Sequence, residues 1–140
     1  MLIEDNPGDV RLIKEALKQS EKVYNLNVVD DGIKALSFLR KENNYKDKPR
    51  PDLIMLDFNI SKKDGLDLLA EIKEDQNFKY IPVIILTRSK AKNNIISCYK
   101  SHANCYITKP VNLHQFINLV KTIELFWFSI VKLPPNRNFG

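Results

Sequence analysis

The sequence has no long apolar run and few cysteines. None of its hydrophobic stretches reaches the roughly 20 residues that a membrane-spanning helix needs, and no signal peptide is visible at its start. Cys98 and Cys105 are too few for a disulfide framework or a zinc site. Internal repeats and low-complexity segments are absent as well. We therefore expect a single domain without membrane contact, located in the cytoplasm, with both thiols reduced.

Acidic residues are scarce in the second half of the chain. Residues 76–140 hold nine Lys and Arg against a single acid, Glu124, whereas residues 1–75 hold 13 against 16. The net charges of +8 and −3 add up to +5 and indicate two functional faces. One group of basic residues is Arg88, Lys90, Lys92 and Lys100. Because no aromatic platform or nucleic-acid-binding motif accompanies them, we expect an acidic protein partner and no nucleic acid. Nucleic-acid binding remains an alternative, which a steep salt dependence would support.

Short apolar runs alternate with helical patterns along the chain. Leu53 to Leu56, which ends at Asp57, and PVIILT at 82–87 are typical of strands buried on both faces of a parallel sheet. Shorter strands are predicted at residues 1–3, 24–29 and 105–108. Helices are predicted at 9–20, 33–39, 66–75, 90–101 and 112–132. This alternation indicates an α/β, doubly wound five-stranded parallel sheet with five helices.

The strand order cannot be computed from the pattern, but 2-1-3-4-5 is one of the common doubly wound orders. We assign residues 1–133 to the domain and residues 134–140 to a C-terminal tail. The first strand is short compared with the mean of about five to six residues. We therefore expect a few residues to precede Met1.

Several strands end in polar residues that an apolar core would reject. They are Glu4-Asp5 after the first strand, Asp57 after the third, Thr87 after the fourth and Lys109 after the fifth. In a parallel sheet these ends share one edge, so the side chains converge. Three neighbouring carboxylates need a cation, and their hard oxygens suit Mg²⁺. A hydroxyl and an ammonium opposite them suit phosphoryl oxygens. The set predicts phosphoryl transfer to a carboxylate, which yields an acyl phosphate.

With these residues the chain resembles the response-regulator receiver domains of two-component signalling, over essentially its whole length. The matching residues are Glu4-Asp5, Asp57, Asp64-Gly65, Thr87, Tyr106 and Lys109-Pro110. The segments LIEDNPGD, KPRPDLIMLD, CYITKPV and FWFSIVKLPP resemble the stand-alone regulators that pair with bacterial and cyanobacterial phytochrome-type histidine kinases. The resemblance implies a flavodoxin-like receiver fold. It also implies a single-domain response regulator that is phosphorylated by a sensor histidine kinase.

The resemblance also implies roles for the residues that bind the cation and accept the phosphoryl group. Asp57 is then the phosphoacceptor and a ligand of Mg²⁺ or Mn²⁺. Asp5 binds the cation directly, Glu4 binds it through water, and Asn59 supplies a backbone carbonyl. The protein would act as a phosphoacceptor that assists its own phosphorylation and dephosphorylation, and not as an enzyme with a separate substrate.

The switch residues follow from the same resemblance. Lys109 would pair with the phosphoryl group, and Thr87 would close on it after phosphorylation. Tyr106 would rotate inward behind Thr87, and the bond between Lys109 and Pro110 would be cis. Such a switch uses new negative charge to pull a hydroxyl and to let an aromatic side chain change rotamer.

The loops around Asp57 depart from the family pattern at two positions. Ser61 stands where the family usually has proline, so we expect a less rigid loop there. Arg88 stands where a small residue is usual. Together with Asn59, it is expected to modulate access to Asp57, by narrowing the approach or by contacting the phosphoryl group. We expect Arg88 to slow turnover.

The last predicted helix carries apolar residues on more than one side. Its predicted core face consists of Phe116, Val120, Ile123, Trp127 and Ile130. The apolar residues off this face are Ile117, Leu125, Phe126 and Phe128. We expect the latter to form a dimer surface. No sequence after Val131 is long enough for an output domain, so output is expected through protein–protein contact or onward phosphate relay.

Two further readings compete with the receiver. An aspartate-nucleophile phosphohydrolase needs a second acid two residues after the nucleophile. Asn59 occupies that position, and no cap domain is present. A receiver-like interaction scaffold that is not phosphorylated is the other alternative, and the intact set of site residues argues against it.

Overall fold

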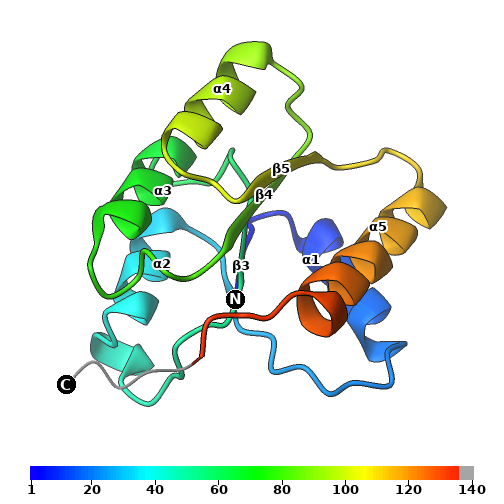
Figure 1. The fold of residues 1–140 in the computed structure, drawn as a ribbon, viewed down its shortest axis with the longest axis horizontal. Helices are drawn as coiled ribbons and strands as arrows, with labels where there is room; N and C mark the ends of the chain where they lie inside the picture. The colour runs from blue at the N-terminus through cyan, green and yellow to red at the C-terminus, as the bar shows by residue number, and fades with distance from the viewer. Residues whose placement is uncertain (136–140) are drawn as a thin grey trace.

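The structure is a computed structural model that describes residues 1–135, which form a parallel sheet with helices on both faces. The strands are β1 (Leu2–Ile3), β2 (Val28–Val29), β3 (Ile54–Leu56), β4 (Val83–Thr87) and β5 (Cys105–Thr108). The helices are α1 (Pro7–Lys18), α2 (Gly32–Leu39), α3 (Gly65–Glu74), α4 (Lys92–Lys100) and α5 (Leu113–Leu125). The strand order over these residues is β2-β1-β3-β4-β5. Helices α2, α3 and α4 cover one face of the sheet, and α1 and α5 cover the other (Figure 1). The predicted fold class and strand order are therefore confirmed.

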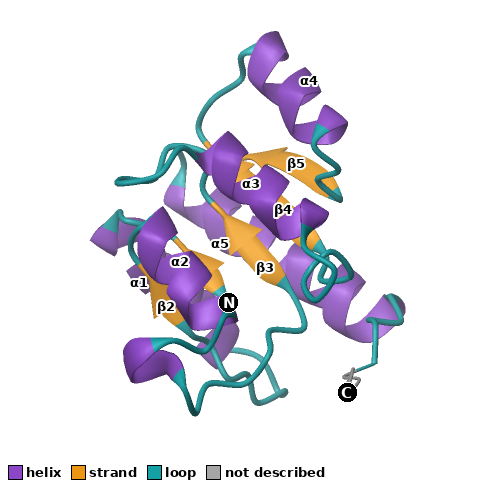
Figure 2. Ribbon diagram, turned by 90° about the vertical axis from the view of Figure 1, so that its left-hand side faces the viewer, coloured by secondary structure: helices purple, strands orange, loops and turns teal. Residues whose placement is uncertain are grey.

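The core lies in two layers, one on each side of the sheet. Strand β4 shows why, because successive side chains of a strand point to opposite faces. Val83 and Ile85 join the cluster under α2 and α3, the face that Figure 2 presents, whereas Ile84 and Leu86 join the cluster under α1 and α5. Every residue of β4 is buried. The prediction that the apolar run at 82–87 forms a strand buried on both faces is therefore confirmed.

Side-chain caps start the helices close to the ends of the strands. The Asn6 side chain accepts a hydrogen bond from the Asp9 backbone amide and caps α1. Asp64 caps α3 and Asn112 caps α5 in the same way. These caps satisfy amide groups that the first helical turn leaves without partners. The turn at Asn6 places α1, and with it Asp9, directly beside the carboxyl end of β1.

Two elements differ from the prediction. Strand β2 consists of Val28–Val29 and does not extend back to residue 24. After α5 the chain continues as a π-helical turn, Phe126–Ile130, closed by a bond from the Val131 amide to the Phe126 carbonyl. A π turn takes more residues than an α turn, so it shifts the later side chains around the axis.

The π turn changes which side chains of the last helix face the core. Ile130, predicted in the core, is 63% exposed. Phe128, predicted on the surface, packs against the core, and its ring centroid lies 5.0 Å from that of Tyr24. Ile117 lies in α5 before the π turn, and it also packs against this core cluster. The core assignment is therefore wrong for Ile130, whereas Ile117 and Phe128 are half-buried and their place in a dimer surface stays a prediction. Leu125 and Phe126 are exposed as predicted.

No helix within residues 1–135 is long and apolar enough to cross a membrane. The division into a domain at 1–133 and a tail at 134–140 stays a prediction, and most of that tail lies outside the described residues.

Candidate phosphoacceptor site

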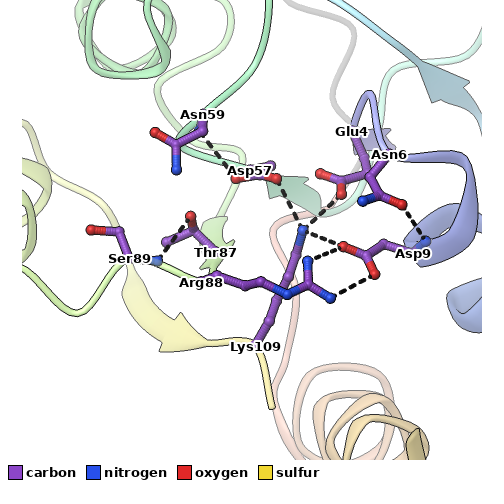
Figure 3. A network of polar contacts seen from close by, with 9 residues as sticks. All are labelled: Glu4, Asn6, Asp9, Asp57, Asn59, Thr87, Arg88, Ser89 and Lys109. Carbon is purple, nitrogen blue, oxygen red and sulfur yellow. Dashed lines mark hydrogen bonds and ion pairs between the residues drawn. The ribbon is translucent and has the colours of Figure 1, made fainter. Parts of the chain in front are cut away.

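The polar strand ends meet at the carboxyl edge of the sheet (Figure 3). Glu4 follows β1, Asp57 follows β3, and Lys109 follows β5, while Thr87 is the last residue of β4. Glu4, Asp57, Thr87 and Lys109 are all buried. The predicted convergence is therefore present in the structure, and it puts charged groups in a place that burial would otherwise make costly.

Lys109 is the centre of this network. Its Nζ donates hydrogen bonds to Glu4 Oε1 at 2.7 Å, to Asp9 Oδ2 at 2.9 Å and to Asp57 Oδ2 at 2.9 Å. The side chain is 2% exposed. Burial alone would lower the pKa of Lys109, but its bonds to the three carboxylates outweigh burial and raise it. Lys109 therefore stays charged and holds the carboxylates together.

Asp57 and Glu4 differ in protonation although they lie side by side. Burial raises the pKa of Glu4 to about 8, and the neighbouring Asp57 carboxylate adds to the effect. Burial also disfavours the Asp57 carboxylate, but the neighbouring Glu4, the Asn59 amide and Lys109 lower the pKa of Asp57. The Asn59 amide donates to Asp57 Oδ1 at 3.0 Å. Asp57 is therefore the ionised carboxylate of the pair, as a nucleophile must be.

Glu4, Asp5 and Asp57 form a set of oxygen donors that fits a divalent cation. Their ligand atoms lie within 4.8 Å of one another, and Asp5 is exposed, so the set opens toward solvent. Glu4 Oε2 is buried and has no hydrogen-bond partner among residues 1–135. A buried oxygen without a partner is costly, and a cation or its bound water would supply one. Carboxylate oxygens with open water positions suit Mg²⁺ or Mn²⁺.

Asp9 also belongs to the network, although the sequence pattern predicts it only as part of a helix start. It is buried, and its carboxylate accepts bonds from Arg88 Nη1 at 2.6 Å and Nη2 at 3.0 Å, in addition to the bond from Lys109. Burial opposes ionisation of Asp9, but Arg88 and Lys109 lower its pKa to about 2. The sequence signal was a third acid one helical turn after Asp5, together with an unexpected arginine at a strand end.

Comparison with known proteins decides the family. A model of the response regulator receiver domain matches residues 1–121. The chain belongs to the response-regulator receiver family. Response regulator Rcp1 of Synechocystis sp. is 44% identical over 134 residues, which cover 96% of this chain and 91% of Rcp1.

Solved structures agree with this assignment. The Mn²⁺-bound form of Rcp1 has a TM-score of 0.92 at 44% identity. The phosphorylated cyanobacterial phytochrome response regulator RcpA has a TM-score of 0.93 at 48% identity. Each comparison covers 96% of both chains. Receiver domains bind a divalent metal ion, in keeping with the acidic cluster of this chain. They are generally signalling proteins without catalytic turnover of a separate substrate.

The remaining receiver residues, Thr87 and Tyr106, lie on β4 and β5. The Thr87 hydroxyl oxygen lies 3.5 Å from the Ser89 amide nitrogen. Tyr106 is half-buried, and its hydroxyl donates to the Ser89 carbonyl at 2.8 Å. Ser89 thus links the loop after β4 to β5. Tyr106 and Thr87 are connected through this loop in the structure, while their switch roles stay predictions.

The loop after Asp57 is tied to a neighbouring turn. Ser61 pairs with Asp31 in a parallel bridge, and its carbonyl accepts a bond from the Gly32 amide at 3.2 Å. Lys62 adds an ion pair with Asp31 at 3.6 Å. The loop therefore has anchors that do not depend on a proline at position 61.

The bond between Lys109 and Pro110 is trans, since no peptide bond within the described part of the chain is cis. The prediction of a cis bond, which the family resemblance implied, is therefore wrong. Trans is also the lower-energy isomer before proline, by about 0.5–1 kcal/mol.

Proposed function

We propose that this receiver accepts a phosphoryl group on Asp57 from a sensor histidine kinase and signals through a conformational switch read by protein–protein contact. One observation carries the proposal. Asp57 is an ionised carboxylate bonded to the buried Lys109 and adjacent to the oxygen donors Glu4 and Asp5. Such a site combines a nucleophile with positive charge for a transferring phosphoryl group.

The transfer follows from these contacts. An Asp57 oxygen attacks the phosphorus atom of the kinase phosphohistidine, the P–N bond breaks, and the imidazole leaves and takes up a proton. When bound to Glu4, Asp5, Asp57 and the Asn59 carbonyl, Mg²⁺ supplies neutralising charge for the phosphoryl oxygens. Lys109 already contacts Asp57 Oδ2 and would pair with a phosphoryl oxygen. In this way the receiver would assist its own phosphorylation and dephosphorylation.

The switch would begin at Thr87, next to the new negative charge. Its hydroxyl would turn to the phosphoryl group, and the loop that carries Ser89 would move with it. The Tyr106 hydroxyl donates a hydrogen bond to the Ser89 carbonyl. A movement of Ser89 would therefore break or shift this bond and so change the position of the Tyr106 side chain on β5. Pro110 follows Lys109 directly, so it would share in any shift of the loop after β5 that accompanies the pairing of Lys109 with the phosphoryl group.

The likeness to a cyanobacterial phytochrome response regulator supports a phytochrome-type kinase as partner. A kinase of that kind would place the receiver in the cytoplasm. The proposed partners are therefore this kinase and a second copy of the receiver, with no nucleic acid or membrane.

The surface for the second copy would be the α5 patch, defined as Leu125, Phe126 and Ile130. These side chains are 59%, 49% and 63% exposed. Helix α5 starts at the carboxyl edge of the sheet and runs back, so its end lies away from Asp57. A second copy could cover this patch permanently while the kinase reaches Asp57. Ile117 and Phe128 stay predicted members of the dimer surface but are left out of the α5 patch, because they also pack against the core.

The test is incubation with Mg²⁺ and a small acyl-phosphate donor, followed by intact-mass measurement. We expect one added phosphoryl group on the wild type and on the control Asp67→Asn, whose carboxylate is exposed on α3. We expect none on Asp57→Asn. If neither the donor nor a histidine kinase phosphorylates the Mg²⁺-loaded wild type, the scaffold alternative would replace this proposal.

A further inference from the structure

Asp9 joins two cations through a single oxygen. Arg88, in the loop after β4, binds both oxygens of the Asp9 carboxylate, and Lys109 binds Oδ2 as well (Figure 3). Lys109 in turn binds Asp57 Oδ2. Arg88 is therefore connected to the phosphoacceptor by three contacts in series, through Asp9 and Lys109. None of the roles proposed above uses Asp9.

The two ends of this ion pair differ in their freedom to move. The Asp9 side chain is 5% exposed, and α1 holds it in place. The Arg88 side chain is 49% exposed and follows Thr87 directly in the chain. Arg88 can therefore reorient while Asp9 stays. Any movement of the backbone at Thr87 toward a phosphoryl group would carry Arg88 in the same direction.

We propose that Asp9 is a positioning residue that holds Arg88 away from Asp57, and that Arg88 transfers from Asp9 to a phosphoryl oxygen once Asp57 is phosphorylated. The inference rests on the proposed function. A phosphoryl group offers more negative charge and more acceptor oxygens than one carboxylate, and the planar guanidinium fits it with paired hydrogen bonds.

This exchange has a chemical consequence for the lifetime of the acyl phosphate. In hydrolysis, a water oxygen attacks phosphorus, the P–O bond to Asp57 breaks, and inorganic phosphate and the Asp57 carboxylate are formed. Arg88 on the phosphoryl group would occupy part of the approach that this water needs. Asp9 therefore keeps the nucleophile accessible before transfer, and Arg88 protects the product afterwards.

Asp9→Asn keeps the size of the side chain but removes the charge that holds Arg88. Released early, Arg88 would pair with the free Asp57 carboxylate and slow phosphorylation by the small donor. It would also stay longer on the phosphoryl group. We expect the rate of phosphorylation by the small donor and the rate of hydrolysis of the acyl phosphate each to fall by roughly tenfold. One charge-assisted hydrogen bond can produce a change of this size. Arg88→Ala should shorten the lifetime of the acyl phosphate.

The decisive variant is the double substitution Asp9→Asn with Arg88→Ala. If Asp9 acts through Arg88, the double variant should behave as Arg88→Ala alone in both rates. A merely structural role of Asp9, or one through Lys109, would instead change the rates by the same factor whether Arg88 is present or not. That result would overturn the inference. Intact-mass time courses after donor removal give the lifetimes, and thermal melting shows that each variant is folded.

The controls separate this inference from the proposed function. Arg11→Ala removes an exposed arginine from the same helix and should leave both rates unchanged. A wild type that never takes up a phosphoryl group would refute the proposed function itself. Uptake by the wild type, with equal rates for Asp9→Asn, would refute only the role of Asp9.

Discussion

At the residue scale, Glu4 and Asp57 show how neighbouring carboxylates take different states. Burial raises the pKa of Glu4 to about 8, whereas hydrogen bonds keep the pKa of Asp57 low despite its burial. In the metal-free protein at neutral pH, the pair therefore holds one proton, and Glu4 carries it. A divalent cation at Glu4, Asp5 and Asp57 needs the Glu4 carboxylate deprotonated, so cation binding and proton release are coupled.

This coupling predicts how Mg²⁺ affinity depends on pH. Because the Glu4 pKa is raised, the proton must be displaced at any pH below about 8. Affinity should rise about tenfold per pH unit from pH 6 toward 8, then level off. Titration calorimetry in buffers of different ionisation enthalpy would measure both affinity and proton release. In Glu4→Gln the affinity should be lower and nearly independent of pH, and a slope equal to that of the wild type would refute the assignment.

Lys109→Met tests what the buried ammonium does for the fold. The substitution leaves Glu4, Asp9 and Asp57 facing one another without the cation that joins them. We expect a loss of about 3–5 kcal/mol in the free energy of unfolding without Mg²⁺. Part of it should return when Mg²⁺ is added. Urea denaturation gives both values, and Lys121→Met, an exposed lysine of α5, is the control. An equal loss with and without Mg²⁺ would contradict this account.

At the scale of elements, apolar runs and helical spacing were enough to predict the sheet, and polar strand ends were enough to predict most of the site. The contact between Asp9 and Arg88 could not be predicted, because it depends on how the loop after β4 lies over α1. The π turn after α5 could not be predicted either. The helical spacing of FWFSIVK predicts an ordinary helix, and the packing of Phe128 on Tyr24 is a tertiary contact that this local pattern does not contain.

The π turn predicts losses of different size for Phe126 and Phe128. Phe128 packs against the core and Tyr24, so Phe128→Ala should lower the free energy of unfolding by about 1.5–3 kcal/mol. Phe126 is 49% exposed in the single chain, so Phe126→Ala should cost much less at protein concentrations low enough to keep the receiver monomeric. Urea denaturation measures the free energy of unfolding of both variants, which remove the same side chain at two positions. An uninterrupted α-helix with Phe126 toward the core would reverse the order.

At the scale of the whole molecule, the two ends of the sheet carry different kinds of surface. The carboxyl edge holds the charged network around Asp57. The α5 patch lies toward the other end and is apolar. Charged and titratable groups at the carboxyl edge suit a transient kinase contact, whereas an apolar patch suits a lasting contact. Because these two surfaces are separate, one receiver would be able to bind its second copy and its kinase at the same time.

The α5 patch predicts that the receiver sediments as a dimer through a symmetric contact, in which the same side chains meet across a two-fold axis. Two copies of Phe126→Glu would place like charges against each other in that contact. We therefore expect this variant to sediment as a monomer while still accepting a phosphoryl group. Ile33→Glu is the matched control, because Ile33 is 55% exposed on α2, across the sheet from α5 (Figure 1). If both variants sediment like the wild type, the patch is not the dimer surface.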